Sequence, residues 1–287
     1  MIKELGTNTP FKFIEIADPS ALDNKHLIKS IKTKKIDGFI AKSLLNENEV
    51  NEILKHLSSL SDSVYMRTPA GKIFPHPFAV VSDEEERLEA YYNNIKLLEK
   101  ERAENQFIDN VFNKLHEFIS LCSGDYQVSV PLNKVKNSPV VPGTFRYLFP
   151  DLGGLYVHCG NYFQDQSKLY YSLVKNDIEM DNQLSYFIVL QNADYGGELT
   201  LYDLYWEAGQ SKDDPQNNDY IIGTHGNKIF MKYLESLDFR PDAGDILIFN
   251  GGPIWHRVED VKGNQPRITL GGFLNFSKDG KELFYWS

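Results

Sequence analysis

Cysteine is scarce in this sequence of 287 residues, which holds only Cys122 and Cys159. Two thiols cannot form the disulfide framework on which small secreted domains depend. No apolar run approaches the ~18 residues of a membrane-spanning helix, and the opening residues MIKELGTNTPFKF lack the apolar segment of a secretory signal. We therefore expect a cytoplasmic protein that has no membrane partner.

Positive charge is also in deficit. The chain has 30 Lys and Arg against 40 Asp and Glu, which gives a formal net charge of -10. Because proteins that bind nucleic acid need clustered Lys and Arg to neutralise phosphates, we expect no nucleic acid partner. The same acidity disfavours a carrier protein as a partner, since carrier proteins are themselves acidic and like charges repel.

Helical patterns dominate the first part of the sequence. Apolar residues recur at helical spacing over 46–60, behind Asn46 as a possible N-cap, and a second helical pattern extends over about 82–121. We find no internal repeat and no low-complexity linker, so a single domain fits the length. Within it we expect a mostly helical N-terminal region, 1–125, that packs on a core formed by 126–287.

The core region has the sequence pattern of a β protein. Short runs rich in Val, Ile, Tyr and Phe alternate there with Gly, Pro, Asn and Asp, and the runs are 144–148, 154–158, 185–191, 198–206, 245–250, 254–261 and 267–276. This pattern predicts a sandwich or barrel, so the fold class is mainly β with flanking helices. The polar stretch 207–219 predicts a long surface loop, and such loops are often lids or specificity elements.

Two of the seven histidines, His158 and His256, lie inside strand patterns next to glycine-rich turns. A lone histidine in a strand is more often structural than catalytic, so the pair by itself indicates little. The surrounding sequence adds to it, because three stretches follow one another in a fixed order: 146-RYLFPDLGGLYVHCG-160, 184-LSYFIVLQNADYGGELTLYD-203 and 240-RPDAGDILIFNGGPIWHRVEDVKGNQPRITLGGFLNF-276.

These stretches resemble the catalytic core of the Fe(II)/2-oxoglutarate oxygenases, in the branch related to prolyl hydroxylases. The resemblance spans about 144–276 and implies a double-stranded β-helix, which is a jelly-roll or cupin-like core. It also implies that His158 and His256 bind Fe(II), and that 2-oxoglutarate and O2 take open positions on the metal. Arg267 would then hold the distal carboxylate of 2-oxoglutarate through its planar fork, with help from the hydroxyl of Thr269.

Two further residues of the same core have less specific expectations. Tyr147 matches a family tyrosine that often contacts the cosubstrate, although simple packing is an equally open interpretation. Arg146 is a candidate for contact with the cosubstrate or with groups around the metal.

The sequence departs from the ordinary members of that family at one position. They carry Asp or Glu two residues after the first histidine, because residues i and i+2 of a strand point to the same side and both reach the metal. Here the motif is His158-Cys159-Gly160, and glycine has no side chain to offer. The vacant position can take an external ligand, and chloride or bromide fits the space and the charge left behind.

The His-x-Gly motif resembles that of the iron/2-oxoglutarate halogenases, among them the free-standing enzymes that act on hapalindole- and welwitindolinone-type alkaloids. The resemblance implies chlorination of an unactivated aliphatic carbon of a free small molecule, with conversion of 2-oxoglutarate to succinate and CO2. Hydrogen bonds near the metal could delay hydroxyl transfer, and the candidates are Ser185, Asn161 and Arg146. Candidates for the apolar substrate wall are Phe78, Val81, Leu155 and Phe163.

Two alternatives stay open on the sequence. In the first, water or a nearby carboxylate such as Asp165 completes the metal shell, and the enzyme is a hydroxylase or other dioxygenase. In the second, loss of the carboxylate has abolished redox chemistry and leaves an inactive binding module. The presence of His256 and Arg267 argues against decay, because an enzyme that had lost its function would have no reason to keep them.

Overall fold

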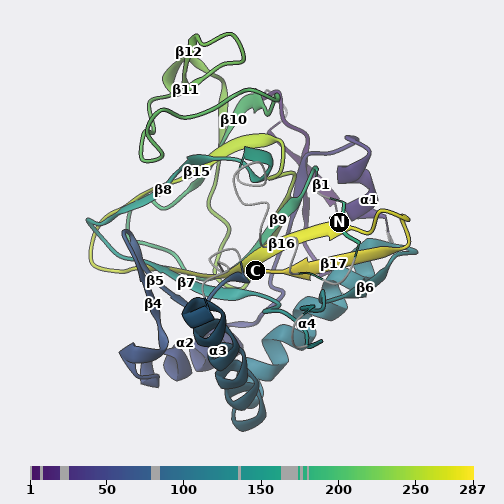
Figure 1. The fold of residues 1–287 in the computed structure, drawn as a ribbon, viewed down its shortest axis with the longest axis vertical. Coiled ribbons are helices and arrows are strands. Elements are labelled where there is room, and N and C mark those ends of the chain that lie inside the picture. The colour runs from purple at the N-terminus through teal and green to yellow at the C-terminus, as the bar shows by residue number, and fades with distance from the viewer. Residues whose placement is uncertain are drawn as a thin grey trace.

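The fold consists of two β-sheets that face one another, with helices on one outer side (Figure 1). The computed structural model describes residues 2–6, 9–19, 26–78, 85–134, 137–162, 174, 177–179 and 181–287. Within these ranges one of the two facing sheets has 11 strands and the other has 4, and a separate hairpin forms a third sheet of 2 strands.

The large sheet has the strand order β1-β2-β3-β14-β9-β16-β7-β5-β4. Its members are β1 (Ile2–Leu5), β2 (Phe13–Ile16), β3 (Gly38–Ala41), β4 (Met66–Thr68), β5 (Gly71–Phe74), β7 (Thr144–Leu148), β9 (Leu184–Gln191), β14 (Ile246–Phe249) and β16 (Arg267–Phe276). β17 (Glu282–Trp286) pairs with the second half of β16 and with β6 (Gln127–Ser129).

The small sheet has the order β13-β10-β15-β8, so β8 lies at its edge. Its strands are β8 (Gly153–His158), β10 (Leu199–Tyr205), β13 (Ser236–Phe239) and β15 (Ile254–Val261). The chain alternates between the sheets: β7, β9, β14 and β16 belong to the large one, and β8, β10 and β15, which follow the first three of them, belong to the small one. This alternation is that of a double-stranded β-helix and confirms the expected fold class.

The strand alternation fills the space between the sheets with apolar side chains. Side chains at every second position point to the same face of a sheet, so one face of each sheet can be apolar throughout. The cluster between the sheets includes Phe187, Val189, Leu199, Leu201, Leu247, Phe249 and Ile254. The intervening residues of the large sheet, such as Tyr186 and Ile188 of β9, point outward into a second cluster.

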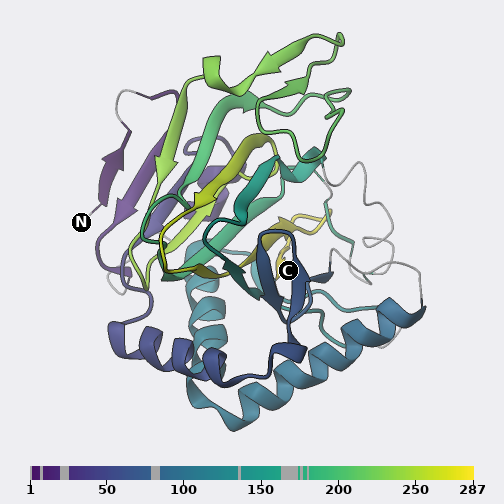
Figure 2. The same cartoon turned by 90° about the vertical axis from the view of Figure 1, so that its left-hand side faces the viewer.

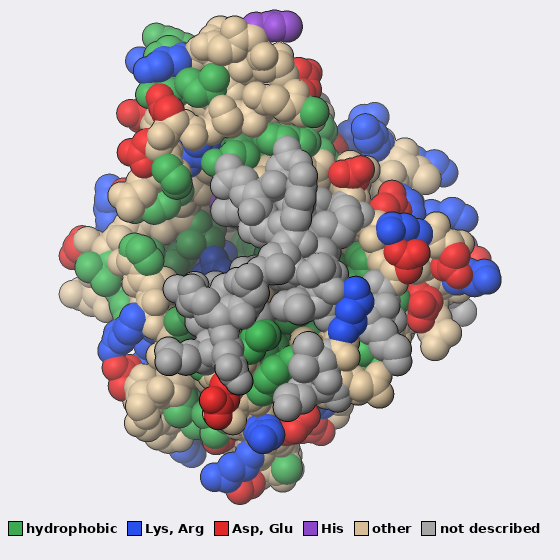
Figure 3. All heavy atoms as spheres, in the orientation of Figure 1, with side chains coloured by type: hydrophobic (Ala, Val, Ile, Leu, Met, Phe, Trp, Pro, Cys, Tyr) green, Lys and Arg blue, Asp and Glu red, His purple; other side chains and the backbone are tan. Residues whose placement is uncertain are grey.

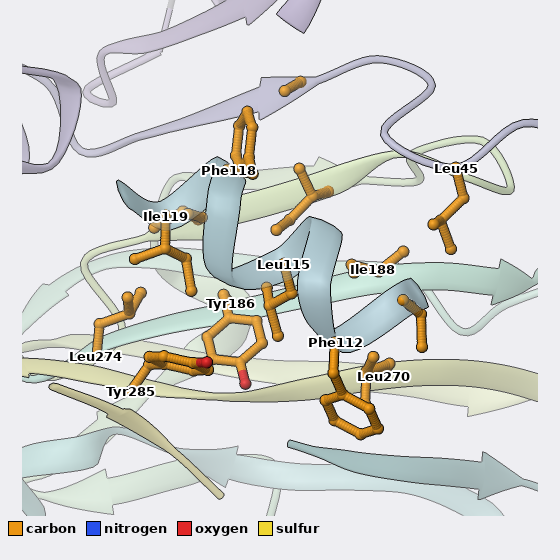
Figure 4. Close-up of a cluster of buried hydrophobic side chains, with 14 of the residues drawn as sticks. Leu45, Phe112, Leu115, Phe118, Ile119, Tyr186, Ile188, Leu270, Leu274 and Tyr285 are labelled. Atoms are coloured by element: carbon orange, nitrogen blue, oxygen red, sulfur yellow. The ribbon is translucent and has the colours of Figure 1, made fainter. Parts of the chain in front are cut away.

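Helices cover that outward face of the large sheet. They are α1 (Leu27–Lys32), α2 (Glu47–Ser59), α3 (Glu85–Glu104) and α4 (Gln106–Ser123). α4 lies across the strands, and Phe112, Leu115, Phe118 and Ile119 on its buried face meet Tyr186, Ile188 and Leu270 of the sheet (Figure 4). α4 therefore supports the barrel from outside.

The expected helices form, with one break. α2 begins directly after Asn46, whose side chain caps it. The expected single stretch over 82–121 is instead two helices, because the side chain of Asn105 accepts hydrogen bonds from the backbone N–H groups of Phe107 and Ile108 and starts α4 there.

The N-terminal region also contributes strands that its sequence pattern does not reveal. β1 to β5 all belong to the large sheet, so residues 1–125 add both helices and strands to the fold. β3 pairs with β14, and β5 pairs with β7, so these additions continue the core sheet on both sides. The boundary at 125/126 stays a prediction.

Residues 206–234 form an extension beside the small sheet, which we call the extension from here on. It contains β11 (Tyr220–Ile222), β12 (Lys228–Phe230) and the short 3-10 helix η4 (Met231–Tyr233). The hairpin stands beyond β10, β15 and β8 in two perpendicular views (Figures 1 and 2). Ile221 and Met231 pack with Val157 and Trp255, which are on the outer face of the small sheet.

The cap of α2 makes a testable contribution to stability. Asn46 Oδ1 accepts from Glu49 N at 3.0 Å, and Glu49 Oε2 accepts from Asn46 N at 2.9 Å. We expect Asn46→Ala to lower the free energy of unfolding by about 1 kcal/mol, as N-cap removal generally does. Denaturant unfolding measures it, with the exposed Asn51→Ala of the same helix as control. Equal stability of the two variants would mean that the cap contributes nothing.

Candidate active site

His158 and His256 come together inside the barrel. His158 ends β8 and is the direct cross-strand partner of His256 on β15. Residues that face each other across an antiparallel pair point to the same side, and the two ring centroids lie 4.3 Å apart. The pair adjoins the apolar cluster between the sheets, since the ring of Phe249 meets His256 edge-on.

The same local geometry fixes both rings. His158 Nδ1 lies 2.6 Å from the carbonyl oxygen of Tyr156, and His256 Nδ1 lies 2.7 Å from the carbonyl oxygen of Ile254. A carbonyl only accepts, so each Nδ1 carries the hydrogen and donates it. In that tautomer the lone pair is on Nε2, which is the nitrogen that binds a metal when Nδ1 is held by a backbone carbonyl.

Burial keeps both imidazoles neutral. It lowers the pKa of His158 well below its usual value, and the neighbouring His256 lowers it further. Burial also lowers the pKa of His256 to about 4. Metal ions bind neutral imidazole, so the pair is in the protonation state that a ligand needs.

The donor set is small, and this suits a metal that must keep open positions. Within the described ranges no cluster of three or more His, Cys, Asp or Glu side chains is arranged to hold a metal. Two neutral imidazoles on one side of a metal leave several positions for small ligands, as iron enzymes that bind 2-oxoglutarate and O2 require. The residues present therefore fit an iron centre.

Gly160 lies against the turn that precedes β15. Its N–H donates to Gly251 O at 2.9 Å, and the N–H of Asn161 donates to Gly252 O at 2.9 Å. A Cβ on Gly160 would stand 3.0 Å from the Cα of Gly252, which is backbone and can yield only by moving the turn. The segment after His158 is therefore clamped to the segment that leads to His256.

Two of the expected neighbours of Gly160 belong to this clamp. The Ser185 hydroxyl is the group that a side chain on Gly251 would strike first, so Ser185 borders the turn. Asn161 Oδ1 accepts from the N–H of Asn182, just before β9. The structure thus brings Ser185 and Asn161 to the same turn as Gly160.

Arg267 and Thr269 face the interior from β16. Arg267 is 5% exposed, and its guanidinium lies 5.0 Å from the ring centroid of Phe187. Burial, together with Arg146, lowers the pKa of Arg267 to about 10. No carboxylate within the described residues forms an ion pair with it, because nearby Glu198 binds Arg240. A buried guanidinium of this kind suits a carboxylate ligand.

Arg146 and Tyr147 are consecutive residues of β7 and therefore point to opposite faces. Arg146 is the cross-strand partner of Thr269 and shares its inner face. Tyr147 points outward, where it packs edge-on against Tyr65 in the cluster beneath the helices. The structure does not bring Tyr147 to Arg267 and Thr269, and this placement favours the packing interpretation.

The candidates for the substrate wall lie in different parts of the fold. Leu155 of β8 is the partner of Val258 and packs with Leu148 inside the barrel, close to the strand start at Arg267. Phe78 is fully buried in another cluster, with its ring 5.4 Å from that of Tyr91 of α3. The remaining candidates, Val81 and Phe163, lie outside the described residues, as does Asp165.

The molecular surface is hollowed on the face of Figure 3. Among the described residues, hydrophobic side chains border the hollow, and Lys or Arg atoms are visible at its floor. An apolar recess with a few polar or charged groups is typical of a site for small molecules.

A family model described as the carrier-protein-independent halogenase WelO5 matches residues 10–287. The chain belongs to this family. It is a non-haem iron, 2-oxoglutarate-dependent oxidoreductase, and its substrate is a free small molecule with no carrier protein.

Solved structures agree on the fold. An N-substituted L-amino acid dioxygenase from Burkholderia ambifaria matches 99% of this chain and 97% of its own, with 15% identity and a TM-score of 0.54. The carbocyclase SnoK from nogalamycin biosynthesis matches 91% of this chain and 86% of its own, with 10% identity and a TM-score of 0.50. No curated protein matches the sequence. None of the helices in the described ranges is long and apolar enough to cross a bilayer.

In this family member the extension holds the residue before each histidine, which sequence reasoning missed. Lys212 Nζ donates to Val157 O at 2.9 Å, and Asn218 Oδ1 accepts from Val157 N at 2.7 Å. Trp255 Nε1 donates to Gln210 Oε1 at 2.8 Å. These polar side chains looked like ordinary loop residues, because the sequence gives no sign of which backbone groups they meet.

We expect Lys212→Met to weaken Fe(II) binding by roughly tenfold, as loss of groups that orient metal ligands generally does. The reason is that β8 is an edge strand and Lys212 holds the residue next to His158. Equilibrium titration of the protein with Fe(II) under anaerobic conditions measures the affinity. Lys232→Met, an exposed lysine of the extension, is the matched control. Iron affinity equal to that of the control would show that β8 holds its position unaided.

Proposed function

We propose that the enzyme chlorinates an unactivated aliphatic carbon of a free-standing small molecule and converts 2-oxoglutarate to succinate and CO2. The observation that carries this proposal is Gly160, which stands two residues after His158 and offers no carboxylate. Chloride or bromide would take the position that Asp or Glu occupies in ordinary oxygenases. Membership of the halogenase family supports the same interpretation.

The packing of the backbone around Gly160 disfavours a side chain at this position. A Cβ would press on Gly252, and Gly251 and Gly252 are themselves hemmed in by Ser185 and Gln183. A side chain at 160 would therefore require the turn before β15 to shift by a few tenths of an ångström. Within the described ranges only His158 and His256 are placed to bind the metal. In this proposal an anion from solution therefore takes the position of the missing carboxylate.

Each residue of the site has a distinct task in this proposal. His158 and His256 bind iron through Nε2, while Arg267 and Thr269 orient 2-oxoglutarate by its distal carboxylate. The iron, when bound, supplies O2 activation and removal of hydrogen from the substrate carbon. Ser185 and Asn161 border the halide position and could hold hydrogen bonds that favour halogen over hydroxyl transfer.

The overall reaction balances with one halide and one proton consumed. Substrate R–H, 2-oxoglutarate, O2, chloride and a proton give R–Cl, succinate, CO2 and water. One oxygen atom of O2 enters succinate and the other enters water. Placement of the substrate carbon decides the outcome, because a displacement of about an ångström can change relative rates by about two orders of magnitude.

An anaerobic titration of the Fe(II)-loaded protein with 2-oxoglutarate tests the halide position directly. The visible charge-transfer absorption is followed with and without chloride. A band that shifts with chloride, together with tighter 2-oxoglutarate binding, is the result expected for halide on the metal. A band indifferent to chloride would favour hydroxylation, and absence of any band would favour a binding module.

Gly160→Asp should abolish the chloride response of this band, because the carboxylate would take the halide position. Gly160→Ala is the matched control, since it adds the Cβ that presses on Gly252 but no charge. We expect the Ala variant to keep a chloride response at reduced stability. A Gly160→Asp variant that still chlorinated would rule out this position as the halide site.

Arg267→Ala should weaken 2-oxoglutarate binding by roughly a hundredfold or more, because one member of a buried, hydrogen-bonded charge pair is removed. Iron affinity should stay nearly the same, since Arg267 is not a metal ligand. Titration with each ligand separates the two effects. Arg102→Ala, which removes a half-exposed arginine of α3, is the control. Unchanged cosubstrate affinity would place the carboxylate anchor elsewhere.

A further inference from the structure

One row of residues crosses the inner face of the large sheet beside the two histidines. Phe249 of β14 pairs with Ser185 of β9, Ser185 pairs with Phe273 of β16, and Phe273 pairs with Trp286 of β17. Partners across antiparallel strands share a face, and the ring of Phe249 lies edge-on against that of His256. The row therefore starts next to the candidate metal ligands and leads away from them along the inner face.

Phe273 differs from the other apolar side chains of this face in its exposure. The inward-facing apolar residues of β7, β9, β14, β16 and β17, strands that the structure describes in full, are otherwise buried. They are Leu148, Phe187, Val189, Leu247, Phe249, Phe284 and Trp286. Phe273 is only partly buried, and it packs against the cluster that contains Phe78 and Trp286, with its ring centroid 6.5 Å from that of Trp286. Packing thus fixes the ring of Phe273 and leaves part of it uncovered.

The residues assigned to the cosubstrate lie in another direction from Phe273. Thr269 precedes Phe273 by four residues on β16, which places it ~13 Å along the strand. The guanidinium of Arg267 extends to the ring of Phe187, whose partner on β16 is Gly271. The residues that hold 2-oxoglutarate therefore reach the level of Gly271 and stop two residues short of Phe273.

The position between them carries no side chain. Gly271 is partly exposed, and a Cβ there would stand 2.9 Å from the carbonyl oxygen of Tyr186 and 3.1 Å from the Cβ of Phe187. The close approach of β9 and β16 therefore requires glycine at this position. The inner face between the cosubstrate residues and Phe273 is thus free of side chains, and an apolar group can lie over it with one end against the ring of Phe273.

Phe273 also neighbours the halide side of the site. Its cross-strand partner Ser185, whose Cβ lies ~5 Å from that of Phe273 in such a pair, borders Gly251. The carbonyl oxygen of Gly251 accepts from the N–H of Gly160. A group that contacts Phe273 is therefore next to the turn that flanks the halide position.

We propose that Phe273 is a specificity-determining residue, whose ring contacts the uncharged, apolar end of the organic substrate and limits how far that end extends. Substrate pockets are lined mainly by apolar and aromatic side chains, and a phenylalanine ring supplies a large contact area. The inference rests on the proposed function in that a small organic substrate binds beside Fe(II) and 2-oxoglutarate. It does not depend on whether halogen or hydroxyl is transferred.

A binding series without turnover tests the length limit. The protein is loaded with Fe(II) and 2-oxoglutarate under anaerobic conditions and titrated with straight-chain primary alcohols from 1-butanol to 1-decanol. Calorimetry gives each Kd, and the visible absorption band of the loaded protein reports whether the alcohol binds near the metal. We expect the affinity to rise by about fourfold for each added methylene, until the chain end meets Phe273 and the rise stops.

The variants should move that break in opposite directions. Phe273→Ala should shift it to alcohols longer by about two carbon atoms, because removal of the ring leaves a cavity. Phe273→Trp should shift it to shorter alcohols, and Phe273→Leu should act as a weaker form of the Ala change. Phe149→Ala, at a partly buried phenylalanine of the outward cluster, is the matched control and should leave the break unchanged. The Kd for 2-oxoglutarate should change by less than about threefold in every variant, which also shows that each is folded.

A thiol at position 273 reports directly whether the ring position is open. The two native cysteines, Cys122 and Cys159, are buried, so N-ethylmaleimide should modify the Phe273→Cys variant and leave the unaltered protein unmodified. Mass spectrometry follows the modification. Loading with 2-oxoglutarate should leave its rate nearly the same, and the tightest-binding alcohol should slow it.

Four results would overturn the proposal. The first is that no alcohol binds the loaded protein or that affinity shows no break with length. The second is that the Ala and Trp variants move the break in the same direction or leave it in place, which would give Phe273 a packing role only. The third is a thiol at 273 that does not react, and the fourth is loss of 2-oxoglutarate affinity as large as in Arg267→Ala. Failure of the halogenase proposal shows up separately, in the chloride response at Gly160.

Discussion

The direct pairing of His158 with His256 across β8 and β15 is the constraint on which the rest of the site depends. Each ring is fixed by its own strand, through a bond from Nδ1 to a carbonyl two residues earlier. Whatever positions the two strands therefore positions the metal, and the clamp at Gly251–Gly252 and the extension both act on those strands.

Among the described residues, the interior of the barrel carries two arginines without a carboxylate partner beside the two histidines that fit a metal. Its inner face carries two guanidiniums and two neutral imidazoles, and Gly160 removes the one carboxylate that related enzymes supply. Negative charge must therefore arrive with the ligands. This arrangement explains why Arg146 and Arg267 lack the carboxylate partners that the other described arginines possess.

Much of the catalytic core could be predicted from sequence. Its strands are long enough to show their pattern, and its motifs occur in a fixed order along the chain. The strand runs over 254–261 and 267–276 match β15 and β16 residue for residue. Sequence reasoning failed where elements are short or contacts are remote. β3 and β5 have four residues each, too few to show a period, and they exist because β14 and β7 offer an open edge.

Side-chain direction was the other limit. Tyr147 matched a family motif. Its neighbour Arg146 points to the inner face of the sheet, and because side chains alternate along a strand, Tyr147 points outward. Phe78 was a candidate for the substrate wall by its position in the sequence, and its apolar ring packs in the cluster with Tyr91. The hydrogen bonds from 207–219 to Val157 and Trp255 could not be predicted from the sequence, because it does not show which strand lies at the edge of the sheet.

The hydrogen bonds from the extension to Val157 also affect the exposed edge of the small sheet. The free side of an edge strand presents N–H and C=O groups to which a second polypeptide can add, and this is a common route to aggregation. At Val157 of β8 those two groups are already taken, by Asn218 and Lys212. At Val157 the extension thus occupies the free side of β8, so a second chain cannot pair with the strand at the residue that precedes the metal ligand His158.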